Sequence, residues 1–404
     1  MNLSELQNAV STAAAIRRRQ RLQPAGGQGD KIFPPTYPGE GNNSPARHVF
    51  ERRRIEGEEK YCVLIDSVQS QANRMEEALL RAAQDGRIRL PRLVVDFPAA
   101  GLNSVGAISS LEAPHRIFDA ILRDSEHGGK KFRESELGAA LRQATAKDAT
   151  AILQAAPTSL LFGVWNSTGE GGGIGAKFAR AIVSEVIGVG VPVEVTKDRN
   201  TDEVRLRSAA RRTGSRIDPL GVPRSVEVYK DKSDWDVDKR NLAKDAKLAR
   251  PSEINHGNIL PSVDILGITC EYGQQTLVIT LAGLRRLRFG SDAVKDHAAR
   301  TWLAALGLVA ALEADRQGHS LRSRCDLVCD GLAPLELVGF DGSTTKIDLD
   351  ADAAVRLHEQ AFDTAAKLFS IDAKPIMLKP QDKLVELVRK SQNKALNDEA
   401  GEEN

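Results

Sequence analysis

The stretch YCVLIDSVQSQANRMEEALLRAAQ, residues 61–84, decides the fold class of this 404-residue chain. It opens with an unbroken apolar run over 61–66, which is typical of a buried strand. It continues over 70–84, where apolar residues recur at the spacing of one helix face. A strand that leads directly into a helix indicates a core in which helices cover a sheet.

Strands and helices alternate outward from this unit. Further strands are predicted over 93–97, 160–165, 191–195, 265–272, 276–281, 326–328 and 336–338. Further helices are predicted over 4–21, 114–123, 136–156, 176–187, 291–315 and 351–370, and after Asp382, with a break near Lys147 in the third of them. This alternation favours an α/β or an α+β core.

Three segments differ from the core in composition. Residues 1–45 are predicted to form an N-terminal helix and a flexible arm, because 24–45 are rich in Gly and Pro. Residues 46–380 are expected to form the core. Within it, 199–262 are predicted to be a basic insertion, since 199–250 hold 14 Lys and Arg against 9 Asp and Glu. Residues 381–404 are predicted to be a C-terminal helix and an acidic tail.

Composition excludes several classes of protein. No apolar run approaches the roughly 20 residues of a membrane span, so we expect a cytoplasmic protein. The four cysteines show no spacing of a zinc site or a disulfide framework. Aromatic residues make up 4% of the chain, which argues against a large base-stacking platform, and the net charge of +1 gives no global attraction to nucleic acid.

A glycine loop over 169–175 is the first candidate site. It lies between a predicted strand and a predicted helix, where backbone amides can face phosphate oxygens and Lys177 and Arg180 would add charge. The chain has no Walker motif here, because Ala176 precedes Lys177 where GK[ST] is needed. Residues 171–176 formally fit the dinucleotide pattern GxGxxG/A, although 166–170 intervene after the strand. A plain surface turn is an equally good interpretation.

Three further segments carry polar groups suited to nucleic acid. The start of the helix after Asp66 could hold a phosphate, with Ser70 as its N-cap and Asn73 and Arg74 in its first turn; ordinary capping is the simpler interpretation. An irregular segment without acidic residues, 205–216, would suit the backbone of single-stranded nucleic acid, or it is a solvated loop. Its arginines are Arg205, Arg207, Arg211, Arg212 and Arg216. A polar turn, RPSEINHGNILPS, holds Asn255, His256 and Asn258, and a lone His is more often structural than catalytic.

Four segments together resemble a known family. They are EGEEKYCVLIDSVQSQANRMEEALL (56–80), LLFGVWNSTGEGGGIGAKFARAIVSE (160–185), RRTGSRIDPLGVP (211–223) and RPSEINHGNILPS (250–262). They are similar to the type I-U (also called I-G) CRISPR-associated RAMP protein, the Cascade backbone subunit of the CRISPR-associated family numbered seven. The resemblance spans roughly residues 45–380.

The resemblance implies an α+β fold with an RRM-like (ferredoxin-like) core and large insertions. It also implies a non-catalytic, RNA-binding subunit without a cofactor or metal, which polymerises along the CRISPR RNA (crRNA) as a helical filament. On this account Gly171, Gly172, Gly173, Lys177 and Arg180 face RNA phosphates. Scarce aromatic residues fit, because the guide's bases must stay free to pair with target DNA.

The implied partners are crRNA, target DNA through guide pairing, and further copies of the chain. The resemblance also implies other Cascade subunits as partners, namely an RNA-processing or capping subunit and a large subunit, together with a recruited helicase-nuclease. The complex that they form serves antiviral defence. Two other classes remain open. One is a dinucleotide-binding oxidoreductase that uses Gly171, Gly173 and Glu194, and the other is a general single-strand RNA-binding module.

Overall fold

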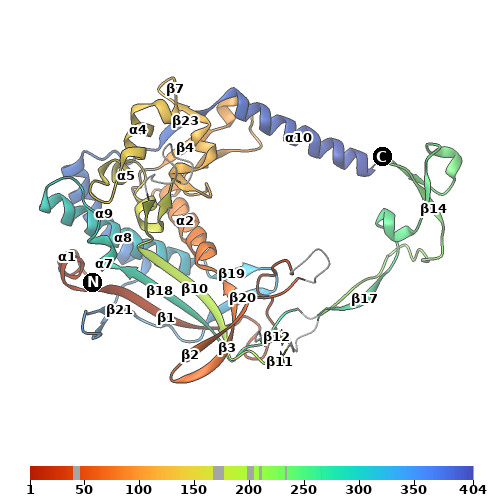
Figure 1. The fold of residues 1–404 in the computed structure, drawn as a ribbon, viewed down its shortest axis with the longest axis horizontal. Helices are drawn as coiled ribbons and strands as arrows, with labels where there is room; N and C mark the ends of the chain where they lie inside the picture. Colours follow the sequence, from red (N-terminus) through yellow and green to blue (C-terminus); the bar gives the residue numbers. More distant parts are fainter. Residues whose placement is uncertain are drawn as a thin grey trace. The chain divides into compact units, whose positions relative to one another are not determined.

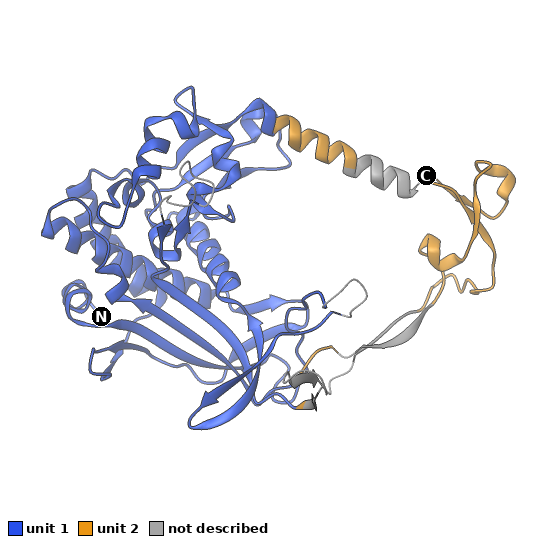
Figure 2. Cartoon of the chain, in the orientation of Figure 1, with its two compact units in different colours: residues 1–192, 269–384 blue, residues 193–268, 385–404 orange. Residues whose placement is uncertain are grey.

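The structure is a computed structural model, and it describes residues 1–39, 46–166, 177–197, 204–208, 212–232, 234–264 and 266–403. For residues 194–197, 204–208, 212–216, 259–264 and 395–403 only the backbone is described. The chain forms two compact units (Figure 2). Unit 1 is Met1–Pro192 with Thr269–Leu384, and unit 2 is Val193–Ile268 with Val385–Asn404.

A large antiparallel sheet is the centre of unit 1 (Figure 1). Its strands, in spatial order, are β19 (His319–Arg322), β20 (Cys325–Cys329), β1 (Ala15–Pro24), β18 (Tyr272–Thr280), β10 (Ile182–Val189), β3 (Glu58–Asp66) and β2 (Phe50–Ile55). The hairpin β21 (Leu335–Val338) and β22 (Thr344–Ile347) extends it along β1. Burial alternates along β1 and β18, so one face of the sheet packs against the rest of the unit.

Helices cover this sheet and fill the core. α2 (Val68–Gln84) packs on β10 and on α8 (Ala293–Arg316), and α9 (Ala351–Phe369) packs on α8. α1 (Leu3–Thr12), α6 (Thr158–Phe162) and α7 (Leu281–Leu284) also contact α8. Because neighbours surround it, α8 is apolar on most sides, and its Trp302 is fully buried. The Asp292 side chain accepts hydrogen bonds from the first turn of α8 and so fixes where the helix begins.

A second sheet in unit 1 joins distant parts of the chain. Its strands, in spatial order, are β5 (Ala107–Ser109), β4 (Leu93–Asp96), β23 (Ile376–Pro380), β6 (Ser125–His127) and β7 (Lys130–Lys131). The short helices around it are η1 (Pro98–Ala100), η2 (Arg116–Phe118), α3 (Ala120–Arg123), η3 (Phe132–Glu134), α4 (Glu136–Gln143) and α5 (Thr150–Ala155). The ladder β8 (Val164–Trp165) and β9 (Lys177–Phe178) follows.

Unit 2 is built from small antiparallel sheets. β11 (Val193–Lys197) pairs with β12 (Val204–Ser208), and β13 (Arg212–Arg216) pairs with β17 (Ile259–Asp264). Between β13 and β17 the chain forms a three-stranded sheet from β14 (Val228–Lys230), β15 (Trp235–Asp236) and β16 (Lys247–Ala249), with the turns η4 (Lys239–Asn241) and η5 (Pro251–Ile254). Most of α10 (Asp382–Glu403) also belongs to this unit. The predicted insertion over 199–262 falls within residues 193–268.

Several predicted elements are confirmed. The fold is mixed α+β. The strand–helix unit at 61–84 is β3 followed by α2, and the helices predicted over 291–315 and 351–370 are α8 and α9. The break near Lys147 separates α4 from α5, and the short strands predicted near 326–328 and 336–338 are β20 and β21.

Other predicted elements are wrong. The helix over 4–21 ends at Thr12, and β1 begins at Ala15. The sequence of β1 does not show the alternation of apolar and polar residues that is typical of a strand, because its buried positions include Arg18 and Gln20. Residues 160–162 of the strand predicted over 160–165 belong to α6, and Val164–Trp165 form the short strand β8. Of the strand predicted over 265–272, Tyr272 begins β18, and the Glu271 N–H donates a hydrogen bond to the Val189 carbonyl oxygen of β10.

The helix over 176–187 is the most consequential error, since these residues form β9 and most of β10. β10 is rich in β-branched residues and lies between β3 and β18, so ladder hydrogen bonds on both sides favour a strand.

Candidate nucleic-acid interface

The glycine loop is closed by a short β-ladder. Val164 pairs with Phe178 and Trp165 with Lys177, whereas Gly171, Gly172 and Gly173 lie outside the described residues. The described residues after the loop, 177–189, form β9 and β10 and no helix, so the expected phosphate contact with a helix N-terminus there is wrong.

An aromatic ring and a cation meet at the base of this loop. The Trp165 side chain is 52% exposed, and the Lys177 Nζ lies 5.2 Å from the centre of its ring. Lys177 is itself exposed. A ring that can stack on a base beside a cation that can meet a phosphate is the usual pairing at single-strand sites.

Arg180 lies beside this ladder. Its Nη1 donates a hydrogen bond to the Val68 carbonyl oxygen at 3.3 Å, in the first turn of α2. Among the residues that the structure describes, no carboxylate contacts Arg180. Burial, together with the charge of Arg116, lowers the pKa of Arg180, but an arginine remains cationic at neutral pH. This half-buried cation therefore suits an external anion.

A buried ion pair between Arg116 and Glu76 interacts electrostatically with Arg180. The Arg116 guanidinium donates to both Glu76 oxygens, at 2.6 and 2.7 Å, and its Nη1 donates to the Gly163 carbonyl oxygen at 3.0 Å. Burial raises the pKa of Glu76, although Arg116 opposes the shift. Gly163 has φ +78°, and a Cβ there would lie 2.9 Å from the Arg180 Cγ, so glycine allows the close approach.

The start of α2 is capped by a different residue from the one predicted. Ser67 is the N-cap, and its Oγ accepts a hydrogen bond from the Ser70 N–H at 3.2 Å. Ser70 is thus the third residue of the helix, and the prediction that it caps α2 is wrong. Asn73 is exposed, while Arg74 turns back into the fold.

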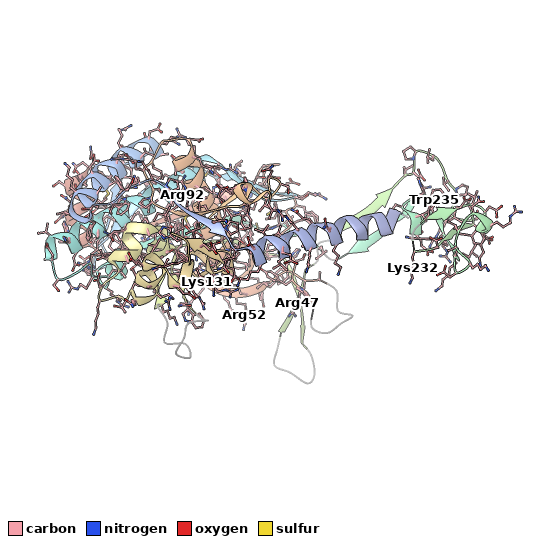
Figure 3. All side chains as sticks on the ribbon, turned by 90° about the horizontal axis from the view of Figure 1, so that it is seen from above. Arg47, Arg52, Arg92, Lys131, Lys232 and Trp235 are labelled. Atoms are coloured by element: carbon pink, nitrogen blue, oxygen red, sulfur yellow. The ribbon has the colours of Figure 1, made fainter. Side chains whose placement is uncertain are left out.

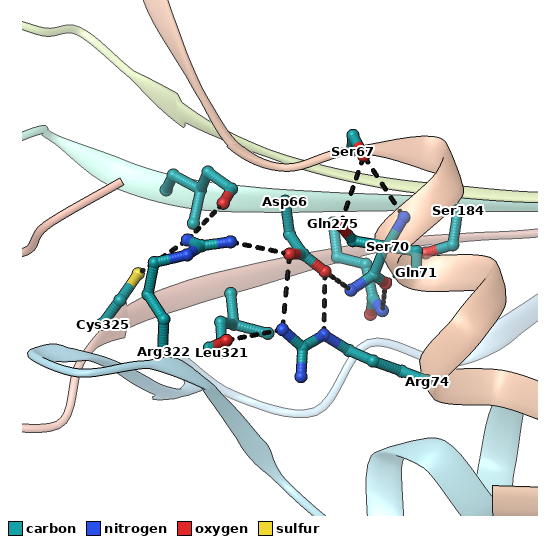
Figure 4. A network of polar contacts seen from close by, with 11 residues as sticks. Asp66, Ser67, Ser70, Gln71, Arg74, Ser184, Gln275, Leu321, Arg322 and Cys325 are labelled. Carbon is teal, nitrogen blue, oxygen red and sulfur yellow. Dashed lines mark hydrogen bonds and ion pairs between the residues drawn. The ribbon is translucent and has the colours of Figure 1, made fainter. Parts of the chain in front are cut away.

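Arg74 belongs to a polar network around the fully buried Asp66 (Figure 4). The Asp66 carboxylate accepts hydrogen bonds from Gln71 at 2.7 Å, from Arg74 at 3.0 Å and from Arg322 at 3.0 Å. Arg74 also donates to the Leu321 carbonyl oxygen at 2.6 Å. These contacts join β3, α2 and β19, and they occupy Arg74 within the protein.

The basic segment is more regular than predicted. Arg205 and Arg207 lie in β12, and Arg212 and Arg216 lie in β13. Arg211 lies outside the described residues, and only the backbone of the other four is described. The expectation of an irregular segment is wrong over these two strands, because β13 finds its partner in β17, more than 40 residues later.

The polar turn has separate local roles. Asn255 is exposed and adopts the left-handed conformation, with φ 59°, at the end of η5. His256 meets the Trp235 ring in a T-shaped contact, with 5.6 Å between the ring centres. The Asn258 Oδ1 accepts a hydrogen bond from the Asp218 N–H at 2.7 Å and so braces the turn.

Lys177 and Arg180 are thus brought together in unit 1, beside the helix that carries Ser70 and Asn73. The arginines of β12 and β13 and the polar turn lie in unit 2. Sequence reasoning missed Trp165 and Arg116. The position of Trp165 directly before the glycine loop could have indicated its role. The sequence around Arg116 does not indicate a buried ion pair, because its partner Glu76 is 40 residues away.

Residues 16–193 match the family model of CRISPR-associated protein GSU0053. The resemblance to a CRISPR-associated family is confirmed. The matched residues run from β1 to just beyond β10 and include Trp165, Lys177 and Arg180. No curated protein was found to match the chain.

The described residues contain no helix that is long and apolar enough to cross a membrane. Nor do they place three or more His, Cys, Asp or Glu side chains where these could hold a metal ion.

Proposed function

We propose that this chain is a non-catalytic, crRNA-binding backbone subunit of a type I Cascade surveillance complex. It polymerises along the guide as a helical filament and presents the guide's bases for pairing with target DNA, in antiviral defence. Its core is RRM-like, in the manner of RAMP proteins, with residues 199–262 as a large insertion.

The observation that carries the proposal is the cluster at the base of the glycine loop, within the residues that match the CRISPR-associated family. Trp165, Lys177 and Arg180 present one exposed ring and two cations, and neither cation contacts a carboxylate among the described residues. Such a site holds an RNA backbone through charge and does not read bases. Sequence is then read by the guide's own base pairing.

The proposed partners are crRNA, target DNA, further copies of the chain, the RNA-processing or capping and large subunits of Cascade, and the recruited helicase-nuclease. The oxidoreductase alternative has no support in the structure. A dinucleotide fold needs a helix directly after its glycine loop, and here the chain returns as a strand.

The test is the nucleic acid that accompanies the protein. The full chain, expressed with a CRISPR array and purified, should show high absorbance at 260 nm and yield RNA of guide sequence. Cellular RNA without guide enrichment would instead make the chain a general RNA-binding module. A preparation that carries no RNA and binds none when crRNA is added would contradict the proposal.

A further inference from the structure

The three-stranded sheet of unit 2 carries an ordered row of side chains. Lys230 in β14 pairs directly with Trp235 in β15 on one side and with Lys247 in β16 on the other. Residues directly opposite each other in antiparallel strands project from the same face, with Cβ atoms about 5 Å apart. One face of this sheet therefore presents Trp235, Lys230 and Lys247 side by side. The neighbouring row of Asp236, Tyr229 and Leu248 projects from the other face.

Trp235 is held in place yet remains accessible. Its side chain is 40% exposed, and the His256 ring meets it in a T-shaped contact at 5.6 Å. Figure 3 shows Trp235 and the exposed Lys232 in this part of unit 2. Trp235 lies in β15, an edge strand of this sheet, and a partly exposed indole held in this way can take a base on its free surface.

Acidic side chains near this row accept hydrogen bonds from the backbone of the adjoining turns. The Asp231 carboxylate accepts hydrogen bonds from the Asp234 and Ala243 N–H groups, and the Asp234 carboxylate accepts one from the Trp235 N–H. Asp238 pairs with Arg240 at 2.5 Å.

The lysines of the row keep their charge available. Lys247 is exposed, and within the described residues the Lys230 Nζ donates a single hydrogen bond, of 3.4 Å, to the Glu253 carbonyl oxygen. The row thus offers two positive charges and one aromatic ring toward solvent.

We propose that this row is a second contact site for an unpaired stretch of nucleic acid, with one base stacked on Trp235 and the adjoining phosphates on Lys230 and Lys247. The proposal rests on the proposed function and adds to it a separate site in unit 2. Phosphates complement the lysines, and a base, unlike a protein surface of mixed charge, complements a single ring at the end of a row of cations. RNA and single-stranded DNA share this chemistry, so the experiment includes both.

The first measurement uses the tryptophan itself. In a full-length chain with Trp165→Phe, Trp235 and the fully buried Trp302 are the remaining tryptophans. Titration with a ten-nucleotide RNA and with a DNA of the same sequence should quench Trp235 fluorescence, and a duplex of equal length should quench it less. The strand that quenches at lower concentration identifies the preferred nucleic acid. No quenching by either strand would overturn the site.

The second measurement compares variants in the otherwise unaltered chain. Trp235→Ala should weaken single-strand binding about 5- to 150-fold, the range of one lost stack, while Trp235→Phe should keep most of the affinity. Lys230→Ala with Lys247→Ala should lower the salt slope by about 1.4, since each phosphate contact on a single strand contributes about 0.7. The matched control is Lys239→Ala with Lys244→Ala, which removes the same charge outside the row and should leave the slope unchanged.

The remaining outcomes separate this site from the proposed function. If Trp235→Ala binds RNA like the unaltered chain while a variant of Lys177 and Arg180 does not, the row is no nucleotide site and the proposed function stands. If the unaltered chain binds no RNA, both proposals fall. If Trp235→Ala changes self-association without RNA and leaves RNA affinity intact, the row is a protein contact and the proposal is overturned. Thermal midpoints within a few degrees of the unaltered chain establish that the variants are folded.

Discussion

The basic side chains of unit 1 differ in whether the fold neutralises them. Arg74 and Arg116 are held by buried carboxylates, at 3.0 Å and 2.6 Å. Arg180 hydrogen bonds to a backbone carbonyl, and Lys177 lies over an indole ring. An interaction with phosphate would therefore compete with an ion pair at Arg74 and Arg116 but not at Lys177 and Arg180.

We expect Lys177→Ala with Arg180→Ala to weaken RNA binding for all sequences alike. Two phosphate contacts would be lost, so the slope of log affinity against log salt should fall by about 1.4. The charge-matched control is Lys130→Ala with Lys131→Ala, which changes the two exposed lysines that form β7. Filter binding from 50 to 300 mM salt measures both quantities, and an unchanged slope in a folded variant would contradict the assignment.

Arg211, Arg212 and Arg216 make a second set of expected RNA contacts. The triple Ala variant should keep its thermal midpoint within a few degrees, because an exposed ion pair contributes only about 0–1 kcal/mol. It should lose most RNA-dependent assembly, and Lys replacements should restore only part of it, since lysine lacks the planar fork of arginine. Normal assembly of the triple variant on RNA would show that the RNA path lies elsewhere.

The buried His358 ties stability to pH. The Trp302 Nε1–H donates to the His358 Nε2 at 3.0 Å, and an indole nitrogen can only donate, so that histidine nitrogen must be unprotonated. Burial lowers the pKa of His358 below its usual 6.5. The unfolded chain then binds the proton more readily than the folded one, so this contribution to stability is present above pH 6.5 and is lost as the pH falls below it.

We expect His358→Gln to cost stability at pH 7.5 and to cost less at pH 5, where the native histidine is disfavoured. Urea unfolding at both values measures the difference. The control is His127→Gln, on β6 in unit 1, whose stability cost should be the same at both pH values. An equal cost for His358→Gln at both values would show that folding does not lower the pKa of His358.

At the scale of elements, the Asp66 network joins three pieces that are far apart in the chain. Asp66 ends β3, Arg74 lies in α2, and Arg322 closes β19 and also donates to the Ile65 carbonyl oxygen at 2.7 Å. The carboxylate is fully buried, so its removal leaves arginines without their partner.

We therefore expect Asp66→Ala to lower the free energy of unfolding by about 3–5 kcal/mol. Glu59→Ala removes the exposed pair with Arg52, at 2.8 Å, and should cost less than about 1 kcal/mol. Denaturant unfolding compares the two. Similar small costs would mean that water readily replaces Asp66.

At the scale of the whole molecule, the proposed filament requires a contact between two different surfaces of the chain. A heterologous contact whose rotation does not close into a ring adds copies until the RNA ends. A net charge of +1 lets copies pack without strong repulsion.

Light scattering should therefore show mass rising in steps as the RNA is lengthened. The variant of Lys177 and Arg180 should remain at the mass of the free chain under the same conditions. One fixed mass at every RNA length would exclude the filament.

The sequence by itself determined the elements whose stabilising contacts are local. α2, α8 and α9 follow from helical spacing and from capping side chains within four residues, because helix hydrogen bonds join residues close in the chain. The resemblance of four sequence segments likewise indicated a CRISPR-associated family from the sequence alone.

The tertiary structure alone decided β1, β10 and the site. Arg18 can occupy an inward position of β1 because Asp315 pairs with it from 297 residues away, and β10 is a strand because β3 and β18 flank it. The cluster of Trp165, Lys177 and Arg180 depends on the same sheet, since the chain must turn back as a strand after the glycine loop. Strand pairing and buried ion pairs join residues far apart in sequence, so local patterns do not reveal them.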